Sequence, residues 1–401
     1  MKIGILTLYH ESCNFGGALQ AYALQKVMSR YGKCEQIDFD FEHADRVYDI
    51  KEIAEINADR TNKDLAYYAK RVIPKTIEMF DKSLERNTFL TDHVMKKTVS
   101  RRKRFEEFRE GIPHSAACGQ DTVASICEAY DLIIAGSDQI WANWLYDSAV
   151  DIFSLGMIQG KRTGVYAASL SSAAISPAHR YILEKNLAKI DFLSVREKRA
   201  KQQIAPFIGE KKCEVVLDPT LLLETEEWDE VEAPIEAADP YMLCYFLGRN
   251  LCHRTFAYKL AQRRGLKTVV FPYIKGNKFS LYDHRAGDIQ DLTSGPREFI
   301  SLIKNAALVL TDSFHAIVFS SLYHKNFFAF LRDRDDDKDS MNDRVRDFLE
   351  DRGLESRLLD PRTVKMDEVG GDVDHKKSDC VLKTQKERSL RFINDMVSKR
   401  G

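Results

Sequence analysis

The chain has 401 residues, of which 44% are hydrophobic and 30% charged, as is typical of a globular protein. That length exceeds what one ordinary hydrophobic core supports, so we expect two domains of similar size. The 60 basic and 61 acidic residues leave a net charge of -1. This balance argues against a nucleic-acid-binding protein, because such proteins carry a basic excess.

The cysteines and the apolar runs indicate where the protein works. None of the 8 cysteines belongs to a C-x-x-C pair, and no histidines accompany them at zinc-ligand spacing. No signal peptide precedes the first strand, and no apolar run reaches the roughly 18 residues of a membrane-spanning helix. We therefore expect a cytoplasmic protein with reduced thiols and no metal site.

The first predicted elements are a buried strand over 3–8 and a helix over 19–31, which carries apolar residues at helical spacing. The loop Asn14-Phe15-Gly16-Gly17 lies between them. Glycines allow a ligand to approach the backbone closely, and a helix N-terminus offers unpaired N–H groups. The loop is therefore either a binding site or simply a tight turn.

The next segment, 45–112, is charged and mostly helical in pattern, and we expect it to be a helical insert in the first domain. It contains the basic run Arg101-Arg102-Lys103-Arg104. Such a run is usually the solvated face of an amphipathic helix. The alternative is a patch for transient contact with anionic lipid, or with a lipid-linked diphosphate, at the inner face of the membrane.

Short apolar strands then alternate with helices along the rest of the chain. The strands of the first half cover 131–135, 163–168, 192–195 and 215–217. The pattern resumes after an acidic, proline-bearing stretch at 224–240 that suits a domain linker, and the later strands cover 241–247, 267–272, 308–312 and 327–331. We expect an α/β fold of two doubly wound, Rossmann-like domains that face a cleft.

The expected boundaries place an N-terminal domain at 1–230, a C-terminal domain at 238–375 and a C-terminal helix at 376–401. In an open parallel sheet, ligands bind at the carboxyl ends of the strands. The residues that directly follow each strand are therefore the first candidates for a functional site.

Two acidic residues follow strands of the first domain. Asp138 could act as a general base or hold a sugar hydroxyl, and its alternative role is to cap the next helix. Trp141 follows closely, and its ring could stack on a sugar or pack in the core. Asp218 precedes a proline, so a role in the turn competes with proton transfer.

Two basic residues occupy comparable positions. Arg196 follows a buried strand, where it could clamp a phosphate or carboxylate in bidentate fashion or pair with Glu197. His315 stands at a strand–helix junction, where a catalytic and a structural role are both open. The acidic loop at 332–339 could hold Mg²⁺, although consecutive aspartates in a loop are usually solvated.

Six short blocks occur along the chain: Asn14 to Tyr22, Gly136 to Trp141, Tyr166 to Ser169, Ser194 to Glu197, Leu217 to Thr220, and Thr311 to Ala316. In content and order they resemble the blocks of the polysaccharide pyruvyl transferase family, over residues 3 to about 350. The resemblance implies a fold like that of the B-type glycosyltransferases. It also implies transfer of a pyruvyl group from phosphoenolpyruvate to a pair of sugar hydroxyls, as a ketal, in surface polysaccharide biosynthesis.

Members of this family bind the donor with arginines and a histidine, which the resemblance carries over to Arg196 and His315. Family members with established activity can carry Arg-Leu-His where this chain has Ser313-Phe314-His315. Either another cation replaces the missing arginine, with Arg344 as the first candidate, or the donor is a different one. We therefore expect donor contacts from Arg196, Ser313, His315 and Arg344.

The resulting hypothesis assigns a step to each group. His315 protonates the methylene carbon of phosphoenolpyruvate, and Asp138 or Asp218 accepts a hydroxyl proton. No metal, nucleotide or other cofactor takes part. The acceptor is a sugar or lipid-linked oligosaccharide, and we expect its contacts on the N-terminal domain to come from Asn14, Gly16, Gly17, Gln20 and Trp141.

Two alternatives stay open at this point. The first is a sugar-nucleotide glycosyltransferase of the same B-type fold, which requires a base- and ribose-binding pocket in the second domain. The second is a catalytically silent, glycan-binding homologue, and Ser313 is the best support for it.

Overall fold

The computed structural model describes residues 1–44, 88–171, 174–209, 213–235, 239–275, 278–279, 281–283, 286–333, 341–371 and 373–398. Two predictions fall largely outside this part of the chain. They are the first half of the helical insert at 45–112 and residues 334–339 of the acidic loop.

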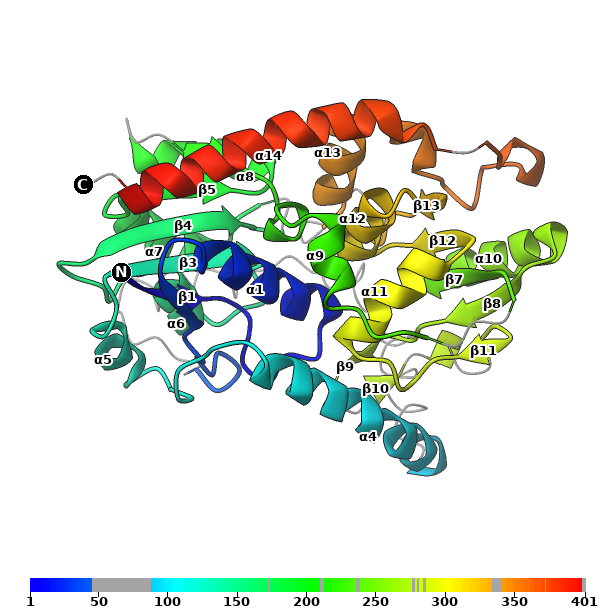
Figure 1. The fold of residues 1–401 in the computed structure, drawn as a ribbon, viewed down its shortest axis with the longest axis horizontal. Coiled ribbons are helices and arrows are strands. Elements are labelled where there is room, and N and C mark those ends of the chain that lie inside the picture. Colours follow the sequence, from blue (N-terminus) through cyan, green and yellow to red (C-terminus); the bar gives the residue numbers. More distant parts are fainter. Residues whose placement is uncertain are drawn as a thin grey trace, which may run out of the picture.

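Six parallel strands form the first sheet, in the order β2-β1-β3-β4-β5-β6 (Figure 1). All seven residues of β3 are buried, because helices cover both faces of such a sheet. The register pairs Ile3 with Leu132 and Ile133 with Thr163. The strands are β1 (Lys2–Leu6), β2 (Lys33–Gln36), β3 (Leu132–Asp138), β4 (Arg162–Ala168), β5 (Phe192–Val195) and β6 (Cys213–Val215).

Five parallel strands form the second sheet, in the order β11-β8-β7-β12-β13. They are β7 (Tyr241–Tyr245), β8 (Lys267–Val270), β11 (Ile289–Gln290), β12 (Leu308–Thr311) and β13 (Phe327–Ala329). A separate antiparallel pair consists of β9 (Ile274–Lys275) and β10 (Lys278–Phe279).

Helices connect these strands. Those of the first half are α1 (Phe15–Met28), α4 (Thr88–Glu110), α5 (Val123–Cys127), α6 (Asp147–Phe153), α7 (Pro177–Leu187) and α8 (Lys198–Ile208). Those of the second half are α9 (Thr225–Asp229), α10 (Leu251–Arg264), α11 (Pro296–Asn305), α12 (Phe314–Leu322), α13 (Asp343–Arg352) and α14 (His375–Ser398). The short 3-10 helices are η1 (Pro219–Leu221), η2 (Leu281–Asp283), η3 (Glu355–Arg357) and η4 (Met366–Glu368).

Each sheet reverses its winding direction once. The reversal lies between β1 and β3 in the first sheet and between β7 and β12 in the second. Two wound parallel sheets of this kind confirm the predicted α/β fold. Ligands of such sheets bind beside the reversal, at the carboxyl ends of the strands, so the loops that follow β1, β3 and β12 are the places to look.

Helix α4 carries the basic run of the sequence, and one of its arginines is not solvated. The Arg101 side chain is buried, and its Nη1 donates a hydrogen bond to the Pro272 carbonyl at 2.9 Å. Its Nη2 donates to the Asp291 carbonyl, and the guanidinium lies 4.5 Å from the Phe271 ring centroid. Arg101 thus attaches α4 to the second sheet, and burial lowers its pKa to about 10.

Helix α14 crosses from the second half of the molecule back to the first sheet, along one long side of the molecule (Figure 1). The Ser389 hydroxyl accepts the Leu217 N–H at 3.0 Å, and Arg162 donates to the Val397 carbonyl at 2.7 Å. Met396 packs directly over Gly164 in β4. The two ends of the chain are therefore held by the same sheet.

One hydrophobic cluster includes buried residues from both sheets. At its centre, the Phe15 ring at the start of α1 lies 4.7 Å from the Phe271 ring and 4.9 Å from the Phe299 ring, both in the second half. Trp228 in α9 also belongs to this cluster and is fully buried. Part of the stretch expected to be a linker is therefore packed in the core.

In the described part of the chain, no helix combines the length and the apolar character needed to cross a membrane.

Candidate functional site

The N-terminus of α1 packs against the N-terminus of α12, and this contact explains the glycine pair. A Cβ atom built on Gly16 would lie 1.9 Å from Nδ1 of His315. No side chain fits in that space, so the first helix can approach the His315 ring only because residue 16 is glycine.

Gly17 serves a different purpose. Its N–H donates to the Asn14 side chain at 3.2 Å, so Asn14 is the N-cap of α1. A Cβ on Gly17 would meet nothing closer than 3.4 Å. Gln20 is fully buried, and its Nε2 donates to Thr7 and to the Gly17 carbonyl. Asn14, Gly17 and Gln20 thus shape the loop, and Gln20 presents no surface to an acceptor.

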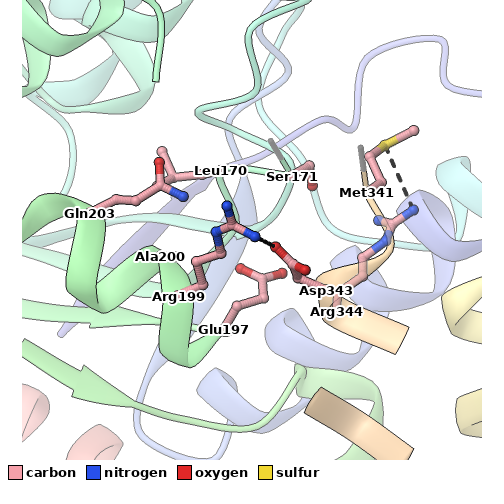
Figure 2. A pocket seen from close by; sticks show the side chains of 9 residues that line it. All are labelled: Leu170, Ser171, Glu197, Arg199, Ala200, Gln203, Met341, Asp343 and Arg344. Carbon is pink, nitrogen blue, oxygen red and sulfur yellow. Dashed lines mark hydrogen bonds and ion pairs between the residues drawn. The ribbon is translucent and has the colours of Figure 1, made fainter. Parts of the chain in front are cut away.

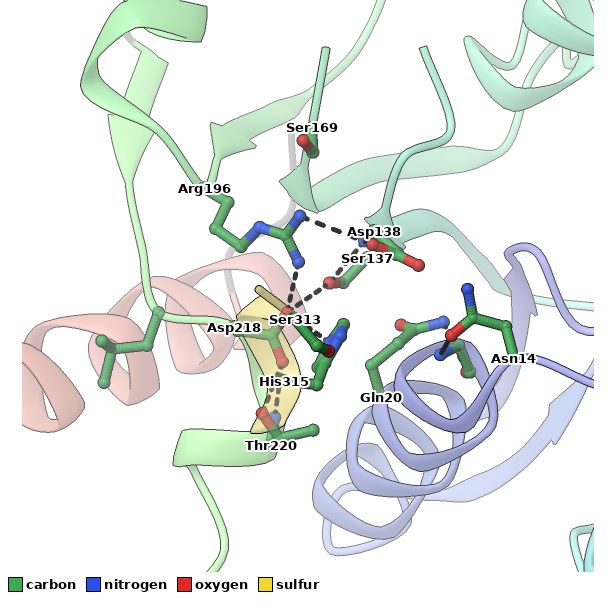
Figure 3. A network of polar contacts seen from close by, with 12 residues as sticks. Asn14, Gln20, Ser137, Asp138, Ser169, Arg196, Asp218, Thr220, Ser313 and His315 are labelled. Carbon is green, nitrogen blue, oxygen red and sulfur yellow. Dashed lines mark hydrogen bonds and ion pairs between the residues drawn. The ribbon is translucent and has the colours of Figure 1, made fainter. Parts of the chain in front are cut away.

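Arg196 lies at the centre of a buried polar network (Figure 3). It follows β5, and its guanidinium is bound by three carboxylates, those of Asp218 at 2.6 Å, Glu197 at 3.1 Å and Asp138 at 3.4 Å. Burial alone would lower the pKa of Arg196, but these carboxylates raise it above its ordinary range. Because these carboxylates engage its N–H groups, Arg196 organises the site. It is not free to clamp the phosphate or carboxylate of a donor substrate.

Asp218 joins this network to the second half of the molecule. It is 1% exposed, and its Oδ1 accepts hydrogen bonds from the Thr220 N–H at 3.0 Å and the Thr220 hydroxyl at 2.7 Å. Its Oδ2 lies 3.5 Å from Nε2 of His315. Although burial raises the pKa of Asp218, His315, Arg196 and Thr220 together hold it well below its usual range. Asp218 therefore remains ionised, and it is a poor base.

His315 presents its two ring nitrogens to different surroundings. Nε2 is buried and faces Asp218 at ion-pair distance, without a hydrogen bond to any protein group in the described part of the chain. Nδ1 lies on the side of Gly16 and the α1 N-terminus. Asp218 thus fixes the orientation of the ring, and Nδ1 faces the junction of the two halves.

Asp138 is the other acidic residue of the network. It ends β3 with φ of 70°, a conformation that residues other than glycine rarely adopt. Its N–H donates to the Ser137 hydroxyl at 2.6 Å. One carboxylate oxygen, Oδ1, faces Arg196, and Oδ2 makes no hydrogen bond within the ranges that the structure describes. Asp138 therefore has a carboxylate oxygen available for a ligand.

Ser313 and Arg344 are the other two residues that the sequence predicts to bind the donor substrate. Ser313 caps α12 and is 4% exposed. Arg344, in the first turn of α13, is 7% exposed, and its guanidinium lies 5.9 Å from the Phe314 ring centroid. The Arg196 guanidinium approaches the same ring at 4.6 Å. Phe314 thus places the two cations around one aromatic ring, next to His315.

A small pocket opens beside Arg344, between the N-termini of α8 and α13 (Figure 2). Its cavity volume is about 20 Å³, room for about one water molecule. The ion pairs Arg199–Asp343 and Lys198–Asp351 join α8 to α13. A larger ligand therefore requires these two walls to move apart.

The structure also corrects the expected contact of Trp141 with the acceptor, as it does that of Gln20. Trp141 is fully buried in the hydrophobic core beside β3, and its Nε1 donates to the Phe153 carbonyl at 3.4 Å. A wholly buried ring cannot stack on a sugar, so Trp141 is a core residue and not an acceptor contact.

Sequence reasoning missed Thr220 as an anchor of Asp218 and Phe314 as the ring between two arginines. Both lie inside blocks that had been recognised, but their roles depend on contacts with distant residues. Among the described residues, no three histidine, cysteine or acidic side chains are placed to hold a metal ion.

Comparisons with known proteins agree with this fold. The structure is similar to the UDP-GlcNAc 2-epimerase of Methanocaldococcus jannaschii, at 12% identity and a TM-score of 0.50, over 100% of this chain and 94% of that chain. It is also similar to a putative UDP-N-acetylglucosamine 2-epimerase from Listeria monocytogenes, at 11% identity and a TM-score of 0.50, over 100% and 97% of the two chains. These similarities show a two-domain fold of the B-type glycosyltransferase class.

No curated protein matches the sequence. The model of one protein family, polysaccharide pyruvyl transferase, matches residues 14–334. That span contains the loop before α1, the network around Arg196 and the His315 junction. Since it covers most of the chain, the protein belongs to the polysaccharide pyruvyl transferase family.

Proposed function

We propose that the protein transfers the pyruvyl group of phosphoenolpyruvate to two hydroxyls of a sugar, forming a cyclic ketal and releasing phosphate. The observation that carries this proposal is the contact of His315 with both Asp218 and the first turn of α1. It brings a proton-transfer group to the junction of the two sheets. We place the donor on the His315 side and the acceptor on the side of Asn14 and Gly16.

His315 acts as the general acid in this proposal. Its Nδ1 gives a proton to the methylene carbon of the donor, and positive charge develops at the adjacent carbon C2. The Asp218 carboxylate, 3.5 Å from Nε2, orients the imidazole for this step. Such positioned proton transfer contributes a factor of about 10² to 10⁴ to a rate.

A sugar hydroxyl then attacks C2 and loses its proton to a base. Asp138 suits this role better than Asp218, because one of its oxygens accepts no hydrogen bond from the described residues, whereas both oxygens of Asp218 are engaged. Phosphate leaves with its bridging oxygen, and the second hydroxyl closes the ketal. The sum is donor plus diol to ketal plus phosphate, a balance that requires no metal, nucleotide or other cofactor.

Arg196 is a positioning residue in this account. It holds Asp138, Glu197 and Asp218 in one arrangement, so its loss misplaces both the base and the partner of the acid. Arg344 is the cation that we assign to the donor, because it is buried beside the site and no carboxylate of the described residues pairs with it.

The acceptor that we propose is a sugar or a lipid-linked oligosaccharide of a surface polysaccharide. A lipid-linked acceptor would bring the protein to the inner face of the membrane, with the catalytic steps on the cytoplasmic side. The buried Arg101 cannot take part in such contact, which leaves the exposed Arg102 and Lys103 of α4 as candidates.

Acceptor-dependent phosphate release tests this proposal. The protein is incubated with phosphoenolpyruvate and a panel of lipid-linked and aryl glycosides. We expect release only with a suitable acceptor, and a loss of at least about 100-fold in His315→Gln. The exposed His324→Gln is the matched control and keeps its activity. Binding of a glycan without turnover would support a silent homologue, and turnover of a nucleotide sugar would support a glycosyltransferase.

A further inference from the structure

Arg344 is a buried cation that lacks an anion. Its Nε is buried without a hydrogen-bond partner, and its Nη2 contacts only the Met341 sulfur, at 3.9 Å. No carboxylate of the described residues lies within ion-pair distance of it. Arg196, which approaches the same Phe314 ring, has three. A buried guanidinium without a partner costs folding free energy unless something compensates for it.

Arg332 is a half-buried cation in a similar situation. It follows β13, and its Nε is likewise buried without a hydrogen-bond partner. The side chains of Asp312 and Arg332 both lie next to Gly248. The Asp312 oxygens, however, already accept the N–H groups of Leu247 at 2.6 Å and Gly248 at 2.9 Å. Within the described ranges, the Arg332 guanidinium has no ion pair.

The segments that carry Arg332 and Arg344 are joined by hydrogen bonds, since the Asn342 side chain accepts the Asp333 N–H at 3.2 Å and donates to the Asp333 carbonyl at 2.8 Å. Burial is the main cause that lowers the pKa of Arg344 to about 9, and the charge of Arg332 is the next. Two like charges that lie close together and are partly shielded from water repel each other. An anion bound between them would relieve both the repulsion and the missing hydrogen bonds.

The neighbouring carboxylates do not supply that anion. Glu197 and Asp343 line the pocket beside Arg344, but Glu197 pairs with Arg196 and Asp343 with Arg199. Among the described residues, no carboxylate is therefore left to supply the anion, which points to a ligand.

We propose that Arg332 and Arg344 together bind a phosphate group, and that this group is the phosphate of the donor substrate. The identity of the donor rests on the proposed function, whereas the phosphate site does not. The site lies beside the Phe314 ring, whose centroid is 5.3 Å from that of His315. A phosphate held there stands near the acid that starts the reaction, and the two guanidinium groups offset its charge as it leaves. Together, Arg332 and Arg344 provide the positive charge of the family arginine that is replaced by Ser313 in this chain.

Thermal unfolding with added inorganic phosphate, phosphoenolpyruvate or UDP tests the site. The variants are Arg344→Met and Arg332→Met, because methionine is unbranched and fills similar space without a charge. The matched control is Arg263→Met, since Arg263 is exposed and pairs with Asp367. We expect phosphate to raise the unfolding temperature of the wild type and the control, but of neither site variant. Without ligand, Arg344→Met should unfold at a higher temperature than the wild type.

Titration calorimetry with Arg344→Lys keeps the test decisive if a methionine variant does not fold. Lysine retains the charge but lacks the two-pronged donor geometry. We expect phosphate to bind about 10- to 100-fold more weakly to it than to the wild type.

Two results would overturn the proposal: no stabilisation of the wild type by any of the three ligands, or stabilisation that survives in both methionine variants. If UDP binds through the two arginines while phosphoenolpyruvate does not, the phosphate site stands and the proposed function falls. If pyruvyl transfer proceeds at the wild-type rate in both variants, the function stands and this inference falls.

Discussion

Asp218 is the residue on which the site depends most, because it joins Arg196 from the first half of the molecule to His315 from the second. It is nearly inaccessible to solvent and its oxygens are engaged by Arg196 and Thr220. Its role is to hold Arg196 and His315 in place. In the reaction that we propose, Asp218 itself neither gives nor takes a proton.

Replacing Asp218 by Asn should lower the free energy of unfolding by about 3–5 kcal/mol, because it leaves a buried Arg196 with one carboxylate fewer. The pKa of Asp218 is depressed in the folded protein, so its contribution is complete above the unfolded value of about 3.9 and is lost as the pH falls below it. Urea unfolding should thus show a constant difference from pH 5 to 8 that narrows below about pH 4. The exposed Asp379→Asn is the control and should change stability by less than about 0.5 kcal/mol. A difference that grows on acidification would refute this assignment.

Replacement by alanine should lower activity at Gly16 and raise stability at Gly17. Gly16→Ala places a methyl group where the His315 ring stands, so we expect at least about a tenfold loss of turnover. Gly17→Ala has room for its methyl group and should raise stability by up to about 1 kcal/mol, because alanine favours a helix. Steady-state kinetics and urea unfolding measure the two effects. Equal activity in both variants would show that the contact between Gly16 and His315 does not matter.

At the scale of elements, the molecule is held together by helices that cross between its halves. Helix α4 reaches the second sheet through Arg101, and α14 returns from the second half to β4. Phe15 of α1 likewise packs against aromatic rings of the second half. The position of His315 relative to Gly16 is thus set by three elements, two of them far from the site.

Replacing Arg101 by Ala should lower the free energy of unfolding by about 2–4 kcal/mol, because two carbonyls lose a charged donor and the space beside Phe271 is left empty. The exposed Lys103→Ala on the same helix should cost less than about 0.5 kcal/mol. Hydrogen exchange should show faster opening of α4 in the Arg101 variant alone. Unchanged protection of α4 would mean that this arginine does not hold the helix.

The strands were the part of the fold that could be predicted most directly. Residues 132–135 and 308–311 are continuous apolar runs, and such runs are typical of parallel strands buried on both faces. The crossing of α4 could not be predicted in the same way. The basic run indicated a solvated surface, whereas the burial of Arg101 depends on carbonyls about 170 and 190 residues away in the chain.

The site was predicted as a set of residues but not as a set of roles. The carboxyl ends of β3, β5 and β12 pointed to Asp138, Arg196 and His315, and the structure brings all three together. Arg196 is already paired with carboxylates, while Arg344 has none among the described residues, and this difference depends on side-chain pairing across the two halves. No local pattern in the sequence encodes that pairing.

At the scale of the whole molecule, the site exists only where the two sheets meet. The first half supplies Gly16, Asp138 and Asp218, and the second supplies His315 and Arg344. The hydrophobic cluster that the two sheets share fixes the positions of these groups relative to one another. The narrow pocket beside Arg344, bordered by exposed ion pairs between α8 and α13, is where a ligand would separate the two walls.

The most direct test of the account follows the proton from His315 to the donor. The reaction is run in D₂O with phosphoenolpyruvate and an accepted glycoside, and the product is analysed by NMR and mass spectrometry. We predict a ketal whose methyl group carries one deuterium from solvent, formed together with free phosphate by the wild type and lost in His315→Gln. A ketal without solvent deuterium, or a glycosidic product made only from a nucleotide sugar, would contradict the central claim.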